Sequence, residues 1–327
     1  MQRRDILAGI AGTTMLGLAT RTARAQSYPN RPIRLVVGFA PGGPTDLIAR
    51  IAARTMSASL GQTVVIENRP GASGRVAASA VARAEPDGYA LLTNVLADMV
   101  GPVIERDTRE PLLRSLAPVA LVGTAPNVLV VHPSLGAGNV RDLAALAKAR
   151  PGTLSYASAG IGTASHLAGV LFAAAADIDL IHVPYNGTAA AQTDLLTGRV
   201  SMMFDNLDNG LSNAAAGKVK ALAVTSPSRW HAAPDVPTIG EAGFPTAEML
   251  SIFGVMAPAG TPAAIVEQLG SALVAASREE ATRRSLLAIS IEPASLGPAE
   301  YRRYLETETR RWEALAAQGR LSGGRNQ

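Results

Sequence analysis

The fold is decided by residues 33–46, which read IRLVVGFAPGGPTD. The apolar, often β-branched run at its start predicts a buried strand over residues 33–39. Glycines and prolines interrupt this run, and a helical pattern then extends from Thr45 to Leu60. A strand, a glycine-rich loop and a helix in direct succession form the basic unit of an α/β fold.

The same succession recurs along most of the chain. Further strands are expected at residues 63–66, 89–93, 128–131, 153–156, 180–183, 202–204, 221–225 and 252–257. Further helices are expected at residues 74–84, 140–148, 163–175, 189–197, 262–276 and 298–317. This alternation predicts parallel or mixed sheets that are covered by helices on both faces. Such sheets bind ligands outside the carboxyl ends of their strands.

The composition is that of a globular chain long enough for about two domains. Of its 327 residues, 47% are apolar and 17% are charged, and none is cysteine. The apolar content argues against intrinsic disorder. The lack of cysteine excludes a disulfide framework and any cysteine-ligated zinc or iron–sulfur site.

The charge balance argues against nucleic acid as a partner. The chain has 30 Lys and Arg against 26 Asp and Glu, and several of the arginines lie in residues 1–25. Without that segment the chain is close to neutral, whereas nucleic acid and anionic lipid require clustered basic residues. Aromatic residues make up only 4% of the chain, too few to build platforms that stack single strands.

Residues 1–25 have the pattern of an export signal. Arg3 and Arg4 precede an uncharged run, and Ala23-Arg24-Ala25 offers a signal-peptidase site. The run is too short for a stable membrane helix, although a retained N-terminal anchor is the alternative. The paired arginines also resemble a twin-arginine signal, which leaves the export route open. We expect export, with cleavage after Ala25.

Three loops that follow predicted strands are suited to backbone contacts with an anion. The first loop covers residues 39–46, the second loop residues 158–166 and the third loop residues 183–188. Their glycines let a ligand approach the backbone, and the helix that follows each loop favours a carboxylate or phosphate at its start. The first loop lacks the Lys-Ser/Thr of a P-loop, and the second loop carries only part of a dinucleotide fingerprint. Each loop can alternatively be a tight turn with a helix cap.

The sequence contains none of the common catalytic motifs. It has no Gly-x-Ser-x-Gly elbow, no His-Glu-x-x-His and no cysteine nucleophile. Its four histidines are not spaced as a metal pair. We therefore predict no catalytic residue, no metal and no cofactor, although acid–base chemistry by distant carboxylates stays an alternative.

Motifs throughout the chain resemble those of one receptor family. They are Tyr28-Pro29 with Arg31-Pro32-Ile33, Phe39-Ala40-Pro41-Gly42-Gly43 with Asp46, Glu67-Asn68-Arg69-Pro70-Gly71-Ala72, Pro86-Asp87-Gly88-Tyr89, Ser158-Ala159-Gly160 with Gly162-Thr163, His182-Val183-Pro184-Tyr185, residues 221–226, residues 234–238, Glu241-Ala242-Gly243 and residues 257–262. In this order they are similar to the Bug solute receptors of tripartite tricarboxylate transporters. Any one motif is modest, but so many in register are specific.

The resemblance implies a periplasmic binding protein of the two-lobed, Venus-flytrap type. Its chain would cross between the lobes twice, near residues 125–128 and 238–245. One lobe would comprise residues 26–126 and 241–327, and the other residues 127–240. We expect a monomer that closes on its ligand by a hinge motion.

In that family the carboxylate of the ligand is held mainly by backbone amides and ordered waters of the first and second loops. The resemblance therefore implies ligand contacts at matching positions of this chain. These are Phe39, Ala40, Pro41, Gly42, Gly43, Thr45, Asp46, Thr93, Asn94, Ser158, Gly160, Ile161, Gly162, Thr163, Tyr185, Gly187 and Asp205.

The function implied by the resemblance is capture of a small carboxylate for the membrane subunits of a transporter. Candidate ligands are a di- or tricarboxylate, an amino acid or an aromatic acid, and we expect no charged residue of the loops to decide among them. A receptor needs only a difference in affinity between its open and closed states. Two alternatives stay open: a ligand-loaded sensor partner of a membrane kinase, and an exported α/β enzyme with an unrecognised site.

Overall fold

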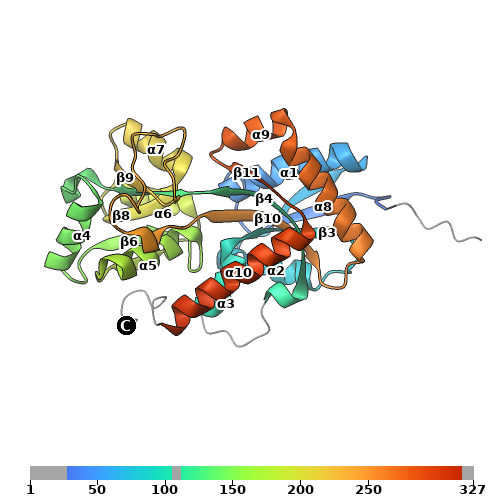
Figure 1. The fold of residues 1–327 in the computed structure, drawn as a ribbon, viewed down its shortest axis with the longest axis horizontal. Helices are drawn as coiled ribbons and strands as arrows, with labels where there is room; N and C mark the ends of the chain where they lie inside the picture. Colours follow the sequence, from blue (N-terminus) through green and yellow to red (C-terminus); the bar gives the residue numbers. More distant parts are fainter. Residues whose placement is uncertain (1–27, 105–111, 319–327) are drawn as a thin grey trace, which may run out of the picture.

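The computed structural model describes residues 28–104 and 112–318, which form two mixed β-sheets with helices on both faces (Figure 1). The predicted signal peptide at residues 1–25 lies outside the described residues. We call the six-stranded sheet with its helices lobe 1, and the five-stranded sheet with its helices lobe 2. The predicted α/β class with two lobes is confirmed.

The sheet of lobe 1 has the strand order β11-β4-β10-β3-β1-β2. Strand β1 is parallel to β2 and β3, whereas β10 is antiparallel to both β3 and β4. The strands are β1 (Ile33–Val37), β2 (Val64–Asn68), β3 (Ala90–Val95), β4 (Leu116–Ala125), β10 (Ser251–Pro258) and β11 (Glu292–Leu296). The helices are α1 (Pro44–Leu60), α2 (Arg75–Ala82), α3 (Leu96–Ile104), α8 (Ala263–Arg278), α9 (Glu280–Leu287) and α10 (Pro298–Ala317), with the short 3₁₀ helices η1 (Ala72–Gly74) and η2 (Leu112–Ser115).

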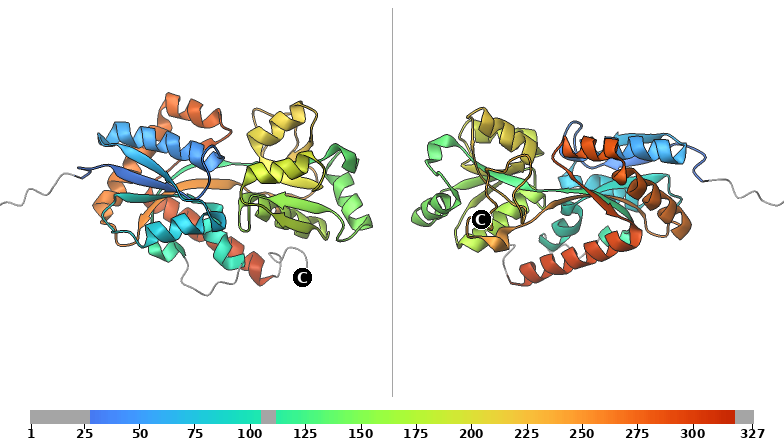
Figure 2. Two further views of the ribbon diagram at one scale, coloured as in Figure 1. Left: turned by 180° about the vertical axis from the view of Figure 1, so that it is seen from behind. Right: turned by 45° about the horizontal axis from the view of Figure 1, so that its top comes forward.

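Strand β1 shows why this sheet has two covered faces. Successive side chains of a strand point to opposite faces of the sheet. All the buried side chains of β1 are apolar. Ile33, Leu35 and Val37 belong to the core beneath α1, α8 and α9, whereas Val36 belongs to the core beneath α2, α3 and α10. Figure 2 shows α1 and α2 on opposite faces of the sheet.

The sheet of lobe 2 has the strand order β7-β6-β8-β5-β9. Strand β6 is parallel to β7 and β8, and β5 is antiparallel to β8 and β9. The strands are β5 (Asn127–Val131), β6 (Ser155–Ser158), β7 (Ile181–Pro184), β8 (Met202–Asn206) and β9 (Lys220–Val224). The helices are α4 (Val140–Ala149), α5 (Ala164–Ala176), α6 (Thr188–Leu196) and α7 (Leu207–Ala215), with η3 (Pro133–Leu135) and η4 (Pro245–Ala247).

Two strands of lobe 1, β4 and β11, were not predicted, and each contains a proline. Strand β4 includes Pro118, which lies opposite Met256 where a β-bulge interrupts the register with β10. Strand β11 includes Pro293, and it lies at the edge of the sheet with its pairing broken after that residue. A proline is tolerated at bulges and on edge strands because no ladder hydrogen bond is needed from it there. Helices α3, α7 and α9 were also missed.

The chain crosses between the lobes at two neighbouring places. It leaves β4 at Ala125 and enters β5 at Asn127, which agrees with the first expected crossing. It returns to lobe 1 only at β10, which begins after the expected range 238–245. The return is later because the residues before β10 pack on lobe 2. The ring of Phe244 lies 5.4 Å from that of Phe172, and the backbone N–H of Met249 donates to Thr225 O at 2.9 Å.

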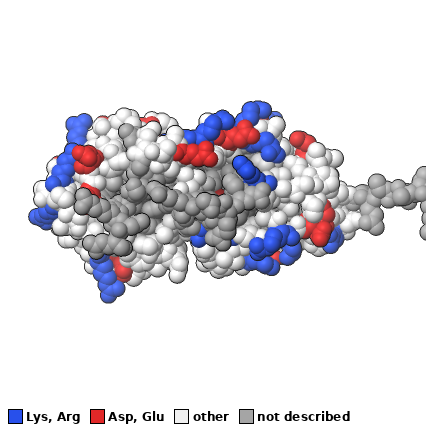
Figure 3. All heavy atoms as spheres, turned by 90° about the horizontal axis from the view of Figure 1, so that it is seen from below, with Lys and Arg blue, Asp and Glu red and all other residues white. Residues whose placement is uncertain are grey.

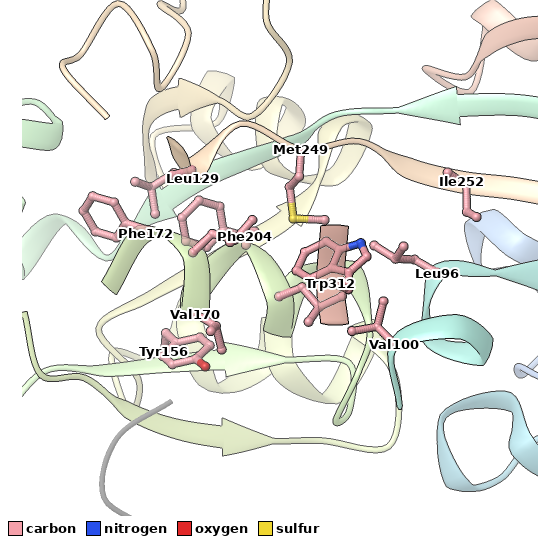
Figure 4. Close-up of a cluster of buried hydrophobic side chains, with 14 of the residues drawn as sticks. Leu96, Val100, Leu129, Tyr156, Val170, Phe172, Phe204, Met249, Ile252 and Trp312 are labelled. Atoms are coloured by element: carbon pink, nitrogen blue, oxygen red, sulfur yellow. The ribbon is translucent and has the colours of Figure 1, made fainter. Parts of the chain in front are cut away.

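Helix α10 of lobe 1 extends along the molecule towards lobe 2 and packs against the return crossing (Figure 1). Trp312 is buried beside Leu96, Val100 and Met249, as the close-up shows (Figure 4). Nη2 of Arg311 donates to the backbone carbonyl of Glu248 at 2.9 Å. These contacts link the last helix to the chain segment that joins the lobes.

The described surface mixes charges of both signs. On the face drawn in Figure 3, basic and acidic groups lie next to one another on both lobes, without a continuous basic stripe in the described part. Within residues 28–104 and 112–318, no helix combines the length and the apolar character that a bilayer-spanning helix requires.

Gly254 of β10 permits the close approach of α10, because a Cβ at this position would collide with the hydroxyl of Tyr301. We predict that Gly254→Ala displaces Tyr301 and lowers the free energy of unfolding by about 1–3 kcal/mol, as over-packing typically does. Urea denaturation measures this loss. The matched control is Gly297→Ala, where the nearest atom to the added Cβ is 3.9 Å away. An equal loss in both variants would contradict the packing argument.

Candidate ligand-binding site

A cavity of about 880 Å³ lies between the two lobes, within the size range of small-molecule sites. It sits at the carboxyl ends of β1 and β3 in lobe 1 and of β6, β7 and β8 in lobe 2. This is the position at which α/β sheets bind ligands. All three loops singled out in the sequence contribute to its lining.

The shape of the first loop is fixed by the carboxylate of Asp46, which does not line the cavity. Oδ2 of Asp46 accepts hydrogen bonds from the backbone N–H of Gly42 at 2.9 Å and from Arg50 Nε at 2.8 Å. Oδ1 accepts from Asn68 Nδ2 at 2.9 Å. Burial alone would raise the pKa of Asp46, but these hydrogen bonds and the charge of Arg50 outweigh it and lower the pKa. Asp46 thus shapes the loop and is neutralised by Arg50.

The second loop is braced by two histidines, the buried His166 and the half-buried His182. The backbone N–H of Gly162 donates to His166 Nδ1 at 3.1 Å, and Ser158 Oγ lies 2.7 Å from His182 Nε2. The two imidazole rings stack with their centroids 4.1 Å apart. Burial lowers the pKa of His166 to about 3, aided by the neighbouring His182, and burial lowers that of His182 to about 4. Both rings are therefore neutral near pH 7, so Nδ1 of His166 can accept a hydrogen bond.

The third loop is tied to the second. The backbone N–H of Tyr185 donates to Ser158 O at 3.0 Å, and that of Gly187 donates to Ala159 O at 3.1 Å. The φ angle of Gly187 is +106°, a conformation that favours glycine. The hydroxyl of Tyr185 donates to Asp194 Oδ2 at 2.7 Å. The two loops therefore present one continuous wall of lobe 2 to the cavity.

Asp205 lies behind that wall and orients an amide. Its Oδ2 accepts from Gln192 Nε2 at 2.7 Å, and Gln192 lines the cavity. Burial raises the pKa of Asp205 to about 6, although the hydrogen bonds from Gln192 and the backbone N–H of Asn206 lower it. Asp205 does not itself line the cavity. Its carboxyl group is partly protonated near pH 6.

Four helices begin at the cavity, and no side chain caps their first turns. Helices α1, α5, α6 and α7 follow Gly43, Thr163, Gly187 and Asn206, all of which line the cavity. By contrast, α4 begins elsewhere and is capped by Asn139, which accepts from the backbone N–H of Asp142 at 2.9 Å. Uncapped N-terminal N–H groups and the helix dipole favour an anion at this place.

The structure separates the predicted contact residues into two groups. Those that line the cavity are Phe39, Ala40, Pro41, Gly42, Gly43, Thr45, Gly160, Ile161, Thr163, Tyr185 and Gly187. Those that do not line it are Asp46, Thr93, Asn94, Ser158, Gly162 and Asp205. The polar side chains of the second group are buried, and most of them hold the loops or neighbouring side chains in place. Their direct contact with a ligand stays a prediction.

Several lining residues were not among the predicted contacts. They include Ser73, Arg75, Asn127, Gln192, Asn209 and Ser251. Arg75 follows a glycine-rich turn at the start of a helix, the same local signal that pointed to the three loops. The others come from helix faces and strand ends, where only the packing of the lobes shows that they meet. No group of three or more metal-ligating His, Asp or Glu side chains occurs in the described parts of the chain.

A family model described as the tripartite tricarboxylate transporter family receptor matches residues 48–321. This chain belongs to that receptor family. The UPF0065 protein in the tcbD-tcbE intergenic region of a Pseudomonas species is 42% identical over 325 residues, covering 98% of this chain and 95% of the relative. Protein BugT of Bordetella pertussis is 36% identical over 293 residues, covering 89% and 90%. The resemblance to the Bug receptors is confirmed.

Solved structures agree with this family assignment. Rpa4515 of R. palustris, solved with adipate, has a TM-score of 0.83 and 36% identity and covers 89% of this chain and 97% of its own. MatC of Rhodopseudomonas palustris, solved with bound malate, has a TM-score of 0.81 and 32% identity and covers 88% and 100%. The periplasmic binding protein BugD has a TM-score of 0.81 and 35% identity and covers 89% and 98%. The chain thus has the fold of a periplasmic solute-binding receptor.

Asp98 lies beside this site, and its contribution to the stability of the fold depends on pH. Its Oδ2 accepts from the backbone N–H of Val95 at 2.8 Å and from Asn94 Nδ2 at 3.0 Å. Burial raises the pKa of Asp98 to about 7, although these hydrogen bonds lower it. Because the pKa in the unfolded chain is lower, the stability that Asp98 contributes is full below about pH 4 and is lost as the pH rises through about 7.

We predict that Asp98→Asn removes this dependence. Between pH 5 and 8 the free energy of unfolding of the wild type should fall relative to that of the variant, as measured by urea denaturation at several pH values. His166 and His182 have lowered pKa values, so their contribution is present above about pH 6.5 and is lost as the pH falls towards 3. It is common to both proteins and cancels in the difference. A difference that does not change with pH would contradict the prediction.

Proposed function

We propose that this protein is an exported, monomeric receptor that closes on a small carboxylate and delivers it to the membrane subunits of a tripartite transporter. The observation that carries the proposal is the meeting of four uncapped helix N-termini at one cavity. No Asp or Glu lines that cavity among the described residues. Asp46 and Asp208 lie in the first turns of α1 and α7, but neither of them lines the cavity. The helix starts therefore favour an anion inside the cavity.

The relatives support a carboxylate as the ligand. Rpa4515 was solved with adipate and MatC with malate, and both ligands are dicarboxylates. Each shares the fold of this chain over nearly its whole length. We infer that the same cavity of this chain takes an acid of this general class.

Binding without turnover fits the chemistry of the site. Ser158 and His182 lie beside the cavity with their Oγ and Nε2 atoms 2.7 Å apart, the distance of a nucleophile and its base. Ser134 Oγ and His132 Nδ1 are also 2.7 Å apart, but neither residue lines the cavity. A nucleophile of this kind must reach the substrate. Ser158 is fully buried and does not line the cavity, and its hydroxyl also lies within hydrogen-bonding distance of the backbone of Gly160. We infer that this pair braces the second loop and that the protein is not an enzyme.

The experiment that tests the proposal is a thermal-melt screen of the purified, refolded protein against mono-, di- and tricarboxylates, amino acids and aromatic acids. A ligand at about 100 times its Kd should stabilise the protein by about 2.7 kcal/mol. We expect one class of acid to raise the melting temperature and to be recovered unchanged. No shift with any acid would contradict the carboxylate proposal, and chemical conversion of the acid would favour an enzyme.

A matched pair of glycine variants tests whether the ligand binds in the cavity. A Cβ at Gly160 would lie 2.6 Å from Ser73 Oγ of the opposite lobe, so Gly160→Ala should hinder closure and abolish most of the ligand-induced shift. Gly217→Ala is the control because Gly217 also has a positive φ angle, +71°, but lies in open space. The control should keep the shift. Loss of the shift in both variants would show that the effect is not specific to the cavity.

Export is tested by measuring the mass of the protein recovered from the periplasm of its natural host. We predict that the periplasmic fraction contains a chain that begins at Gln26, because Ala23-Arg24-Ala25 matches a signal-peptidase site. Intact-mass spectrometry of that fraction measures the new N-terminus. A chain that keeps Met1 and sediments with the membranes would contradict cleavage and indicate a retained anchor.

A further inference from the structure

Helix α10 spans the junction between the two lobes (Figure 1). Its first turns are fixed to lobe 1, because the hydroxyl of Tyr301 donates to Asn94 Oδ1 at 2.5 Å and lies against Gly254 of β10. Its later turns reach the chain segment that returns from lobe 2, where Nη2 of Arg311 donates to the backbone carbonyl of Glu248 at 2.9 Å. The helix is thus part of lobe 1 and holds the return segment as well.

The residues that α10 holds in the return segment are bonded to lobe 2. The backbone N–H of Met249 donates to Thr225 O at 2.9 Å, and that of Glu248 donates to Pro245 O at 3.2 Å. A Cβ at Gly240 would collide with the carboxyl group of Glu248, so this side chain packs closely on lobe 2. If the lobes move apart, residues 248 and 249 therefore move with lobe 2, whereas α10 moves with lobe 1.

Trp312 makes an apolar contact across this junction. It is buried beside Met249 of the return segment and beside Leu96 and Val100 of α3 (Figure 4). Among the described residues, its indole N–H has no hydrogen-bond partner. The contact therefore depends on packing alone, and separation of Trp312 from Met249 would expose apolar surface to water.

Leu96 connects this contact to the cavity. It is the first residue of α3, and it lines the cavity together with its neighbours Val95 and Ala97. The carboxyl group of Asp98 holds this turn in place, because its Oδ2 accepts from the backbone N–H of Val95 at 2.8 Å. A solute in the cavity would thus contact the same turn whose Leu96 packs beside Trp312.

We propose that α10 is a strap that holds the lobes in their closed arrangement, with Trp312 as a positioning residue that acts through Met249. The arrangement seen here is a closed one, since Ser73 and Gly160 lie against each other across the cavity. Contacts that join the lobes in this arrangement raise the closed fraction and with it the apparent affinity for a solute. The inference rests on the proposed closing of the receptor and names the device that sets its balance.

The test measures the distance between the lobes. Because the chain has no cysteine, Ser212→Cys on α7 and Ala281→Cys on α9 place two spin labels at exposed positions, one on each lobe. Pulsed electron paramagnetic resonance then gives the distance between the labels, alone and with adipate or malate as the probe acid. We expect Trp312→Leu to lengthen this distance in the ligand-free protein and to weaken binding of the probe acid by about three- to tenfold.

Trp230→Leu is the matched control for loss of a buried indole. Trp230 is also buried, but it packs in a cluster whose members all belong to lobe 2. Its substitution removes core packing without changing the junction, so the distance between the labels should stay that of the wild type. The inference is overturned if both variants lengthen the distance equally, or if Trp312→Leu leaves it unchanged or shortens it.

A second pair of variants decides the question even if Trp312→Leu does not fold. Arg311→Ala removes the hydrogen bond to the carbonyl of Glu248. Arg310→Ala removes a neighbouring arginine, whose guanidinium donates to Thr307 Oγ1 of the same helix at 3.4 Å. Only Arg311→Ala should lengthen the distance between the lobes. Equal distances in these two variants would also overturn the inference.

These outcomes are distinct from those that test the proposed function. If the wild type binds no carboxylate, the proposed function fails, whereas the distances in the ligand-free variants still decide the role of the strap. If the wild type binds adipate or malate and all variants share one fixed distance with and without the acid, carboxylate binding stands and the strap is refuted.

Discussion

The antiparallel pairing of β4 and β10 is the interaction on which the rest of the structure depends. The two strands lie side by side in the sheet of lobe 1, where Ser251 pairs with Ala125 at the end nearest lobe 2. Both connections between the lobes leave from this end, so the lobes are joined by two adjacent backbone segments (Figure 1). Asn127 secures the junction, because its Oδ1 accepts from Ser251 Oγ at 3.0 Å while its backbone N–H donates to Thr225 Oγ1 at 2.8 Å. A junction of this kind suits a hinge motion.

Away from this junction, contacts between described residues also bridge the lobes at the rim of the cavity. The turn around Ser73 meets the second loop at Gly160. Ser290 of lobe 1 donates to the carboxylate of Asp208 in the first turn of α7. A receptor of this type works when ligand contacts add to contacts of this kind and shift the equilibrium towards the closed state. The cavity lies between the junction and these contacts, so a bound solute would touch both lobes.

The titratable groups around the cavity are arranged so that it holds little negative charge. Asp46 is paired with Arg50, and burial raises the pKa values of Asp98 and Asp205. All three carboxyl groups lie behind the wall and not in the lining. His166 and His182, which brace the second loop, are neutral near pH 7 and act as acceptors and packing groups.

Local sequence determined the units from which the site is built. Apolar runs, glycine-rich turns and helical periodicity act over a few residues, so the three loops and the helices that follow them were predictable, as was the receptor family from its motifs. Tertiary structure alone decided which side chains meet, because the meeting points join residues far apart in the chain. It placed Asp46 behind its loop and Arg75 in the cavity. It also accommodated Pro118 at a bulge and Pro293 on a sheet edge, where local rules argue against strands.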